Sequence, residues 1–427
     1  MRAGAWRPGA AAACGALALL AAGACQSARP RPTQAHEFLT GATQALAQGD
    51  VRRADEVLTR GRVRHPEDGA LLLWSALVAD MRGRGAEAAE HLRVASRATL
   101  PEGLDAAEVR GRLGELLFRY GHYTESLPHL LAGAVGPEAE RRRALRALAL
   151  RLPDLRREPE DLAAELPLVP GPLPQLLCRS GDKERPFLLD TGATYTTVTR
   201  SAAAELGVTP VVAAGEVRDG SGRLFPVQMG LLPAFSLGQV ELGAQPVLVV
   251  EDERLGLRDL AGGPAVATAG VVGLDVLGRF RITLDPERRS LAFALERGSM
   301  PRDAVEVVRA HGCLLVPVRI EGRTLWFVLD SGANLSSLTA EGLRILPGGE
   351  SRAGAAFLRV RTPGGTGVAV RAVHGVTLQV GATRFAVVDL PVVEREFPSG
   401  FPVHGVLGAD LLMTVRVTLG GGRLVLS

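Results

Sequence analysis

The chain has 427 residues, which is enough for two or three domains that each bury a core of their own. Its composition is that of an ordinary globular protein, with 46% hydrophobic residues, 22% charged residues and a formal net charge of +3. The basic charge is mostly arginine dispersed among 46 acidic residues, with no basic block that interleaves aromatic residues, and this argues against nucleic-acid binding.

Residues 1–25 resemble a bacterial lipoprotein signal. Two arginines precede an apolar stretch from Ala10 to Ala24, which is shorter than the roughly 20 residues of a membrane span. The stretch ends at Cys25 in a segment similar to a lipoprotein box, whose cysteine carries the lipid after cleavage. Because Gln26 follows Cys25, we expect an anchor in the outer membrane. The alternative is ordinary cleavage beside a chance cysteine.

Residues 36–152 carry alanine, leucine and arginine at helical spacing, which predicts a helical domain. Gly49, Gly83 and Gly121 lie 83 − 49 = 34 and 121 − 83 = 38 residues apart and mark a repeat. Five positions after each glycine stands a small residue, namely Ala54, Ala88 and Ser126. Nine positions after each glycine stands a leucine, namely Leu58, Leu92 and Leu130. The pattern resembles tetratricopeptide repeats, which implies paired helices and a final helix over Glu138–Leu152 that caps the stack. The alternative is a bundle of amphipathic helical hairpins.

A proline-rich segment, residues 153–175, follows the helical domain. Its prolines interrupt regular structure and predict a semi-rigid linker. Beyond it, short runs of valine, leucine and phenylalanine separated by glycine and proline predict an all-β region with one lobe over 176–299 and another over 300–427. The expected strands include Val247–Val250, Arg281–Leu284, Cys313–Ile320 and Arg384–Val388.

The β region contains two pairs of related motifs. Asp190-Thr191-Gly192-Ala193 and Asp330-Ser331-Gly332-Ala333 each end an apolar run, and a second apolar motif at Gly273 recurs at Gly408. The first pair is 330 − 190 = 140 residues apart and the second is 408 − 273 = 135, so both halves keep nearly the same register. We interpret this as a tandem duplication. Short helices are expected after each of the two later glycines.

Two carboxylates placed on turns after buried strands indicate acid–base chemistry. A single buried carboxylate is costly to ionise. If the halves pack about a pseudo-twofold axis, Asp190 and Asp330 meet and share one proton, since like charges about 3 Å apart cannot both ionise. The ionised member of such a pair can activate water while the other protonates a carbonyl. The predicted reaction is peptide-bond hydrolysis.

The four motifs resemble those of retropepsin-like aspartic proteases, the retroviral type, in the fused single-chain arrangement that pepsin also has. The resemblance covers roughly residues 176–427 and implies an all-β bilobal acid-protease fold. It also implies that the paired aspartates, Asp190 and Asp330, are catalytic, and that Thr191 and Ser331 form an interlocking grip. Gly192 and Gly332 would allow sharp turns and close approach. Neither a cofactor nor a metal is expected.

Two candidate flap hairpins lie at residues 215–225 and 360–368. In this family a flap closes over an extended peptide. No tyrosine follows Tyr195, so the flap tyrosine of pepsin is missing and the retroviral pattern is closer. Ala193 and Ala333 stand where pepsin-like sequences often place a hydroxyl that lowers the pKa of the aspartate, so we expect a pH optimum nearer neutral than strongly acidic.

These motifs together predict an aspartic endopeptidase on the periplasmic side of a bacterial cell envelope, acting on a peptide or protein, whose helical repeats bind a substrate or partner protein. One alternative is a catalytically inactive lipoprotein that binds peptides or acts as a scaffold. Another is that the repeats carry the function and the β lobes are a platform. Cys178 and Cys313 would form either a disulfide or two isolated thiols.

Overall fold

The computed structural model describes residues 35–427 with several gaps. The gaps are residues 101, 103–104, 156–161, 210, 219–223, 256, 259–264, 267, 296–299, 361–367, 394–396 and 398–399. The predicted signal segment and its lipidation site, Cys25, lie outside the described residues. Among the described helices, none is long and apolar enough to cross a membrane.

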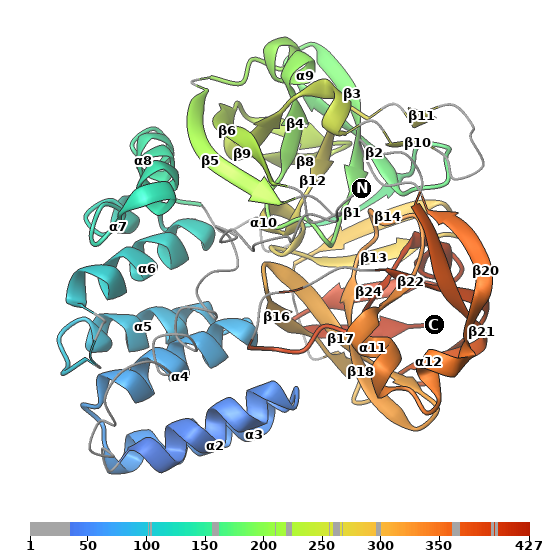
Figure 1. Ribbon diagram of the computed structural model, residues 1–427. Helices are drawn as coiled ribbons and strands as arrows, with labels where there is room; N and C mark the ends of the chain where they lie inside the picture. The colour runs from blue at the N-terminus through green and yellow to red at the C-terminus, as the bar shows by residue number, and fades with distance from the viewer. Residues whose placement is uncertain are drawn as a thin grey trace, which may run out of the picture.

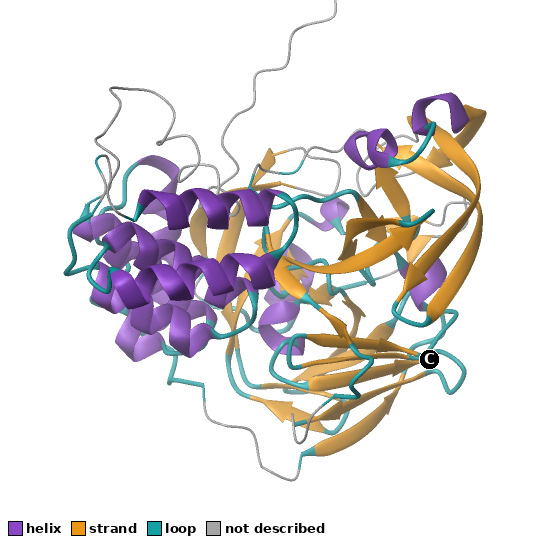
Figure 2. Ribbon diagram, turned by 90° about the horizontal axis from the view of Figure 1, so that it is seen from below, coloured by secondary structure: helices purple, strands orange, loops and turns teal. Residues whose placement is uncertain are grey.

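An array of antiparallel helices forms one side of the molecule, and the β lobes form the other (Figures 1 and 2). The helices are α2 (His36–Ala47), α3 (Val51–Arg64), α4 (Gly69–Met81), α5 (Gly85–Ala95), α6 (Ala106–Arg119), α7 (Tyr123–Ser126) and α8 (Gly136–Ala149). Asp50, Asp68 and Asp105 cap α3, α4 and α6, each accepting a hydrogen bond from the backbone N–H three residues later. The predicted helical region is confirmed, with helices from His36 to Ala149, and the final helix expected over Glu138–Leu152 is observed over Gly136–Ala149.

Equivalent positions of the predicted repeat have equivalent conformations. Gly49, Gly83 and Gly121 follow α2, α4 and α6 with φ of 77°, 74° and 80°, the left-handed region that glycine adopts without strain. The small residues five positions later, Ala54, Ala88 and Ser126, are completely buried. The assignment to tetratricopeptide repeats stays a prediction.

The third helical pair departs from the other two. Its second helix, α7, ends at Ser126, and Pro128 follows two residues later. Proline has no N–H to donate to the carbonyl four residues earlier, and its ring clashes with that carbonyl. The helix therefore stops after one turn, and the chain reaches α8 through a series of turns.

The proline-rich segment contains a strand, β1 (Ala163–Pro167), so the prediction that prolines interrupt all regular structure over 153–175 is wrong for these five residues. β1 pairs with β14 at the edge of a sheet, where a proline costs no ladder hydrogen bond. The segment is thus a connection whose middle is attached to the β region.

Three main sheets build the β region. The first lobe has the strand order β5-β6-β9-β4-β12-β3-β2-β7-β8, and the second has β16-β17-β18-β23-β19-β22-β21-β20. A sheet shared by both lobes has the order β1-β14-β13-β24-β25-β15. This arrangement confirms the predicted fold, in which a helical region precedes an all-β bilobal acid-protease fold.

The bounds of the first-lobe elements are β2 (Gln175–Ser180), β3 (Lys183–Leu189), β4 (Thr197–Thr199), α9 (Arg200–Glu205), β5 (Val212–Arg218), β6 (Leu224–Leu232), β7 (Phe235–Leu237), β8 (Val240–Leu242), β9 (Gln245–Val250), the 3-10 helix η1 (Asp252–Arg254), β10 (Leu257–Arg258), β11 (Ala265–Val266), β12 (Gly270–Val272) and α10 (Leu274–Leu277). The shared sheet adds β13 (Arg281–Asp285), β14 (Ser290–Ala294), β15 (Val305–Glu306), β24 (Val417–Gly420) and β25 (Arg423–Leu426).

The second-lobe elements are β16 (Val308–Ala310), β17 (Cys313–Ile320), β18 (Arg323–Leu329), β19 (Ser337–Thr339), α11 (Ala340–Ile345), α12 (Gly349–Arg352), β20 (Ala353–Val360), β21 (Val368–Val380), β22 (Thr383–Val393), β23 (Gly405–Leu407) and α13 (Ala409–Leu412). All four predicted strands and both helices expected after Gly273 and Gly408 are present.

The two lobes repeat one topology around the Asp-Thr/Ser-Gly motifs. β3 pairs in parallel with β12, and β18 pairs in parallel with β23 at the corresponding register. In each lobe the returning strand, β12 or β23, also pairs antiparallel with the short strand that follows the motif, β4 or β19. The lobes therefore have the pairing expected of a tandem duplication.

The first helices of the array pack on the second lobe. Residues of α2, α3 and α4 share a buried apolar cluster with Val308, Leu315 and Val328 of β16, β17 and β18. At this contact the turn at Gly49 lies directly against the indole of Trp326, where a Cβ would overlap the ring. The equivalent turn at Gly83 has open space.

Gly49→Ala and Gly83→Ala separate the cost of backbone strain from the cost of this contact. Both variants place a Cβ at positive φ, which costs about 1–2 kcal/mol. Gly49→Ala must also displace Trp326, and overpacking adds about 1–3 kcal/mol. We expect urea unfolding to show a larger loss of stability for Gly49→Ala. Equal losses would contradict the packing of this turn on the second lobe.

Candidate active site

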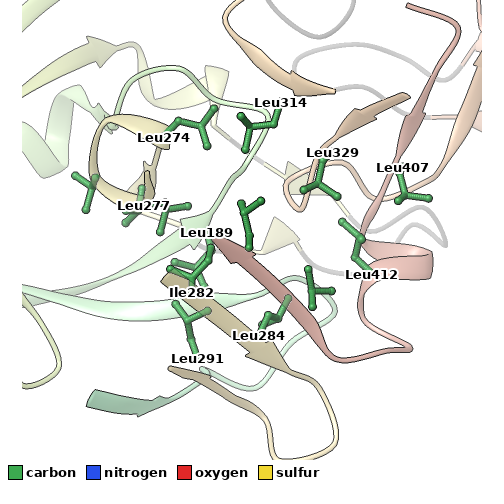
Figure 3. Close-up of a cluster of buried hydrophobic side chains, with 14 of the residues drawn as sticks. Leu189, Leu274, Leu277, Ile282, Leu284, Leu291, Leu314, Leu329, Leu407 and Leu412 are labelled. Carbon is green, nitrogen blue, oxygen red and sulfur yellow. The ribbon is translucent and has the colours of Figure 1, made fainter. Parts of the chain in front are cut away.

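Each motif aspartate begins a loop at the end of a buried strand. Asp190 follows β3, and its N–H donates to the carbonyl of Val272 at 3.1 Å. Asp330 follows β18, and its N–H donates to the carbonyl of Leu407 at 3.0 Å. The preceding residues, Leu189 and Leu329, lie in an apolar core between the lobes (Figure 3). The strands therefore carry both loops to the junction of the lobes.

Four hydrogen bonds lock the two loops together through Thr191 and Ser331. The Thr191 hydroxyl donates to the carbonyl of Leu329 at 2.7 Å and accepts from the N–H of Ser331 at 3.1 Å. The Ser331 hydroxyl donates to the carbonyl of Leu189 at 2.7 Å and accepts from the N–H of Thr191 at 3.1 Å. Both side chains are buried, so each bond satisfies backbone groups that water does not reach.

The two carboxyl groups face each other across the junction of the lobes, each directly over the glycine of the opposite loop. Asp190 Oδ1 accepts from the N–H groups of Gly192 at 2.7 Å and Ala193 at 3.1 Å. Asp330 Oδ1 accepts from the N–H groups of Gly332 at 3.0 Å and Ala333 at 2.9 Å. One oxygen of each carboxyl group is thus fixed by its own loop.

Positions 192 and 332 need glycine because the aspartate of the opposite lobe lies close to each of them. A Cβ on Gly192 would lie 2.5 Å from Cγ of Asp330, and a Cβ on Gly332 would lie 2.5 Å from Cγ of Asp190. Neither glycine has a positive φ, so any residue could adopt the backbone conformation. The space is instead taken by the aspartate of the opposite lobe.

The pKa of Asp190 is held well above its ordinary value. Burial is the largest cause, and the carboxylate of Asp330 is the second, because two negative charges in contact repel. The backbone hydrogen bonds from Gly192 and Ala193 act in the opposite direction. A proton shared between the two carboxyl groups relieves the repulsion, and such a pair titrates as one unit.

A second pair of carboxylates, Asp275 and Asp410, accepts hydrogen bonds from the loops that follow the motif aspartates. Asp275 accepts from the N–H and the hydroxyl of Thr196, both at 2.8 Å, and that hydroxyl accepts from the N–H of Gly273 at 3.2 Å. In the second lobe Asp410 accepts from the N–H of Ser336 at 2.8 Å and from its hydroxyl at 2.7 Å. Each pair ties the loop that follows a motif aspartate to the first turn of α10 or α13.

Burial raises the pKa of Asp275 to about 6 and also raises the pKa of Asp410, although the hydrogen bonds from Thr196 and Ser336 favour the ionised forms.

The hydrogen bonds of Thr196 and Ser336 to these carboxylates were not predicted from the sequence. A signal was present, because 196 − 190 = 6 and 336 − 330 = 6, so a hydroxyl residue stands six positions after each motif aspartate.

A turn from the second lobe also touches the loop of the first motif, Asp190-Thr191-Gly192. The hydroxyl of Thr194 donates to the carbonyl of Gly312 at 2.7 Å, and Cys313 Sγ lies 3.7 Å from the carbonyl oxygen of Gly192. Cys178 and Cys313, both in the described part of the chain, are not joined to each other in a disulfide. Nothing in the local sequence predicts the contact, since more than a hundred residues separate its two sides.

Both predicted flap hairpins are present as strand pairs. β5 pairs antiparallel with β6, and β20 pairs antiparallel with β21. The connecting residues, 219–223 and 361–367, lie outside the described residues. The ranges that the structure describes contain no cluster of three or more side chains suited to a metal ion.

Thr191→Val tests the contribution of the interlocking hydroxyls. It removes two hydrogen bonds and leaves buried backbone groups of Leu329 and Ser331 unsatisfied, at a cost of about 2–4 kcal/mol. Thr191→Ser keeps the hydroxyl and makes position 191 the same residue as Ser331. We expect it to lower the free energy of unfolding by less than about 1 kcal/mol. Equal urea midpoints for the two variants would contradict this account.

The aspartyl protease family model matches the chain twice, at residues 177–276 and 316–411. No curated protein matches the chain. Each match covers one of the two Asp-Thr/Ser-Gly loops and the later glycine motif of the same lobe. Over the matched residues each β lobe is therefore similar to an aspartyl protease domain, and the two matches are consistent with a tandem duplication.

Proposed function

We propose that the protein is an aspartic endopeptidase that hydrolyses peptide bonds with water activated between Asp190 and Asp330. The observation that carries this proposal is the close approach of the two carboxyl groups, each directly over the glycine of the opposite loop, on loops that four hydrogen bonds lock together. An Asp-Gly turn that served only to reverse the chain would not need a second aspartate facing it. The family matches in both lobes support protease activity in general.

The arrangement suits general acid–base catalysis. With one shared proton, the ionised carboxyl group takes a proton from a bound water while the protonated one donates to the carbonyl oxygen of the peptide. The hydroxide so formed adds to the carbonyl carbon. The carboxyl group that took the water's proton then donates it to the peptide nitrogen, while the other carboxylate takes a proton back from a hydroxyl of the intermediate. The C–N bond breaks and the amine leaves, so no covalent enzyme intermediate forms. An extended peptide would be bound by strand-like hydrogen bonds to the flap hairpins, β5–β6 and β20–β21.

We propose that this activity belongs to the periplasmic side of a bacterial envelope, with a lipid at Cys25 as anchor. The support is the N-terminal sequence alone. We further propose that the helical array binds a substrate or partner protein in the manner of tetratricopeptide repeats. The equivalent turns at Gly49, Gly83 and Gly121 support this assignment.

Asp190→Asn tests the proposed function against an inactive binding protein of the same fold. We expect cleavage of a mixed peptide library to fall at least about 100-fold, because the pair can no longer exchange one proton between acid and base. Asp182→Asn makes the same chemical change on an exposed side chain and serves as the control. A wild-type protein that cleaves no better than Asp190→Asn would favour the binding reading.

The pH dependence of cleavage follows from the raised pKa of Asp190. Activity needs one protonated and one ionised carboxyl group, and a raised pKa keeps the shared proton in place to higher pH. We therefore expect kcat/KM to fall on the alkaline side well above pH 4, which is about the ordinary carboxyl value, with an optimum nearer neutral. A profile that peaks well below about pH 4 would contradict the raised pKa of Asp190.

A further inference from the structure

The last helix of the array, α8, packs on the outer side of the β5–β6 hairpin of the first lobe. Leu145, Leu148 and Ala149 of α8 lie in one buried apolar cluster with residues from both strands of the hairpin. Those strand residues are Ala214, Val227 and Met229, which are 5%, 4% and 2% exposed. A candidate flap is thus buried on one side by a different domain.

The contact extends along the hairpin toward its tip. Val217 and Phe225, next to the last described residues of the two strands, are partly buried and pack against the same cluster. The guanidinium of Arg254 lies 4.8 Å from the centre of the Phe225 ring. Because apolar surface is costly to expose, moving β5–β6 outward requires separating it from α8 or moving both together.

The helix α8 is itself fixed to α6 by a buried ionic network. Arg142 is 2% exposed, donates to Glu115 Oε1 at 2.5 Å and donates to the carbonyl of Ala132 at 2.8 Å. Arg141 pairs with the other oxygen of Glu115 at 2.7 Å. Although burial opposes it, the two guanidinium groups lower the pKa of Glu115. The carboxylate therefore stays charged and ties α6 to α8.

Further ion pairs connect this end of the array to the second lobe. Arg119 of α6 pairs with Asp80 of α4 at 2.9 Å. Just after α4, Arg82 contacts Glu306 of β15 at 3.6 Å. The array consequently reaches from the shared sheet and the second lobe, where α2, α3 and α4 dock, to the flap hairpin of the first lobe.

We propose that the helical array is a brace for the β5–β6 hairpin, and that Leu145 and Leu148 of α8 are positioning residues for the peptide-binding cleft. The β20–β21 hairpin lies on the far side of the molecule from the array, so the two hairpins are held differently (Figures 1 and 2). The β5–β6 hairpin is held by the array. This inference rests on the proposed peptidase function for its effect on substrate, but the brace itself is a structural property.

Leu148→Ala in the full chain tests the brace, with Leu113→Ala as its matched control. Both leucines are almost fully buried, at 0% and 1% exposure. Leu113 belongs to a cluster made only of α4, α5 and α6 side chains and their partly buried neighbours, whereas the cluster of Leu148 includes the hairpin. The same substitution therefore disturbs the array in both variants and the hairpin contact in only one.

Native-state hydrogen exchange of the β5–β6 amides is the first measurement. We expect exchange at least about ten-fold faster in Leu148→Ala and near wild-type rates in Leu113→Ala. If Leu148→Ala does not fold, Leu148→Val is measured in the same way and should show a smaller increase in the same amides. Unchanged exchange in the Leu148 variant, or equal increases in both variants, would overturn the brace.

Cleavage kinetics provide the second measurement. We expect Leu148→Ala to raise KM several-fold with a smaller change in kcat, since the β5–β6 hairpin is loosened while both aspartates stay in place. Leu113→Ala should leave KM unchanged, and equal KM values for the two variants would overturn the positioning role. If wild type cleaves no peptide, the proposed function fails while the exchange result still decides the brace.

Discussion

Two carboxyl groups held close together, which repel each other when both are ionised, are the constraint on which the β region depends. Asp190 and Asp330 repel each other when both are ionised, so the lobes must be held together by other interactions. The hydroxyls of Thr191 and Ser331 do this by bonding across the junction to backbone carbonyls of the opposite lobe. Glycine at 192 and 332 leaves room for the facing aspartates. A change at any of these positions alters the distance between the acids.

The lobes repeat this arrangement but are supported unequally. Behind the first loop, Asp275 accepts a further hydrogen bond at 2.8 Å from Gln245, whose side-chain oxygen accepts from Arg279. In front, a turn from the second lobe contacts Thr194 through the carbonyl of Gly312. The helical array then packs on the hairpin of the first lobe. The duplicated sequence has thus acquired different surroundings in each half.

Local patterns predicted the parts of the structure that depend on local chemistry. The strand Cys313–Ile320 was predicted with its observed bounds, because a short, mostly apolar run between Gly312 and Gly322 favours a strand. The pairing of Asp190 with Asp330 followed from the duplication, since equal motifs at equal registers occupy equivalent places. The glycines of the helical repeat likewise adopt the left-handed conformation that helix ends favour.

Contacts between distant segments were not predictable in the same way. β1 lies among prolines and is a strand only because β14 offers an edge to pair with. The buried Arg142 is one of three consecutive arginines, and only the tertiary structure shows which of them enters the core. The packing of α8 on β5–β6 joins two domains, and no local sequence pattern in either domain predicts this contact.

The central claim, that Asp190 and Asp330 share one proton, is tested most directly by NMR titration of 13C-labelled aspartate carboxyl carbons, with each resonance assigned by its loss in the corresponding Asn variant. We expect two well separated macroscopic pKa values for the pair, the higher one well above the ordinary value of about 4. Two independent titrations near pH 4 would contradict it, because carboxyl groups that do not interact cannot divide the roles of acid and base.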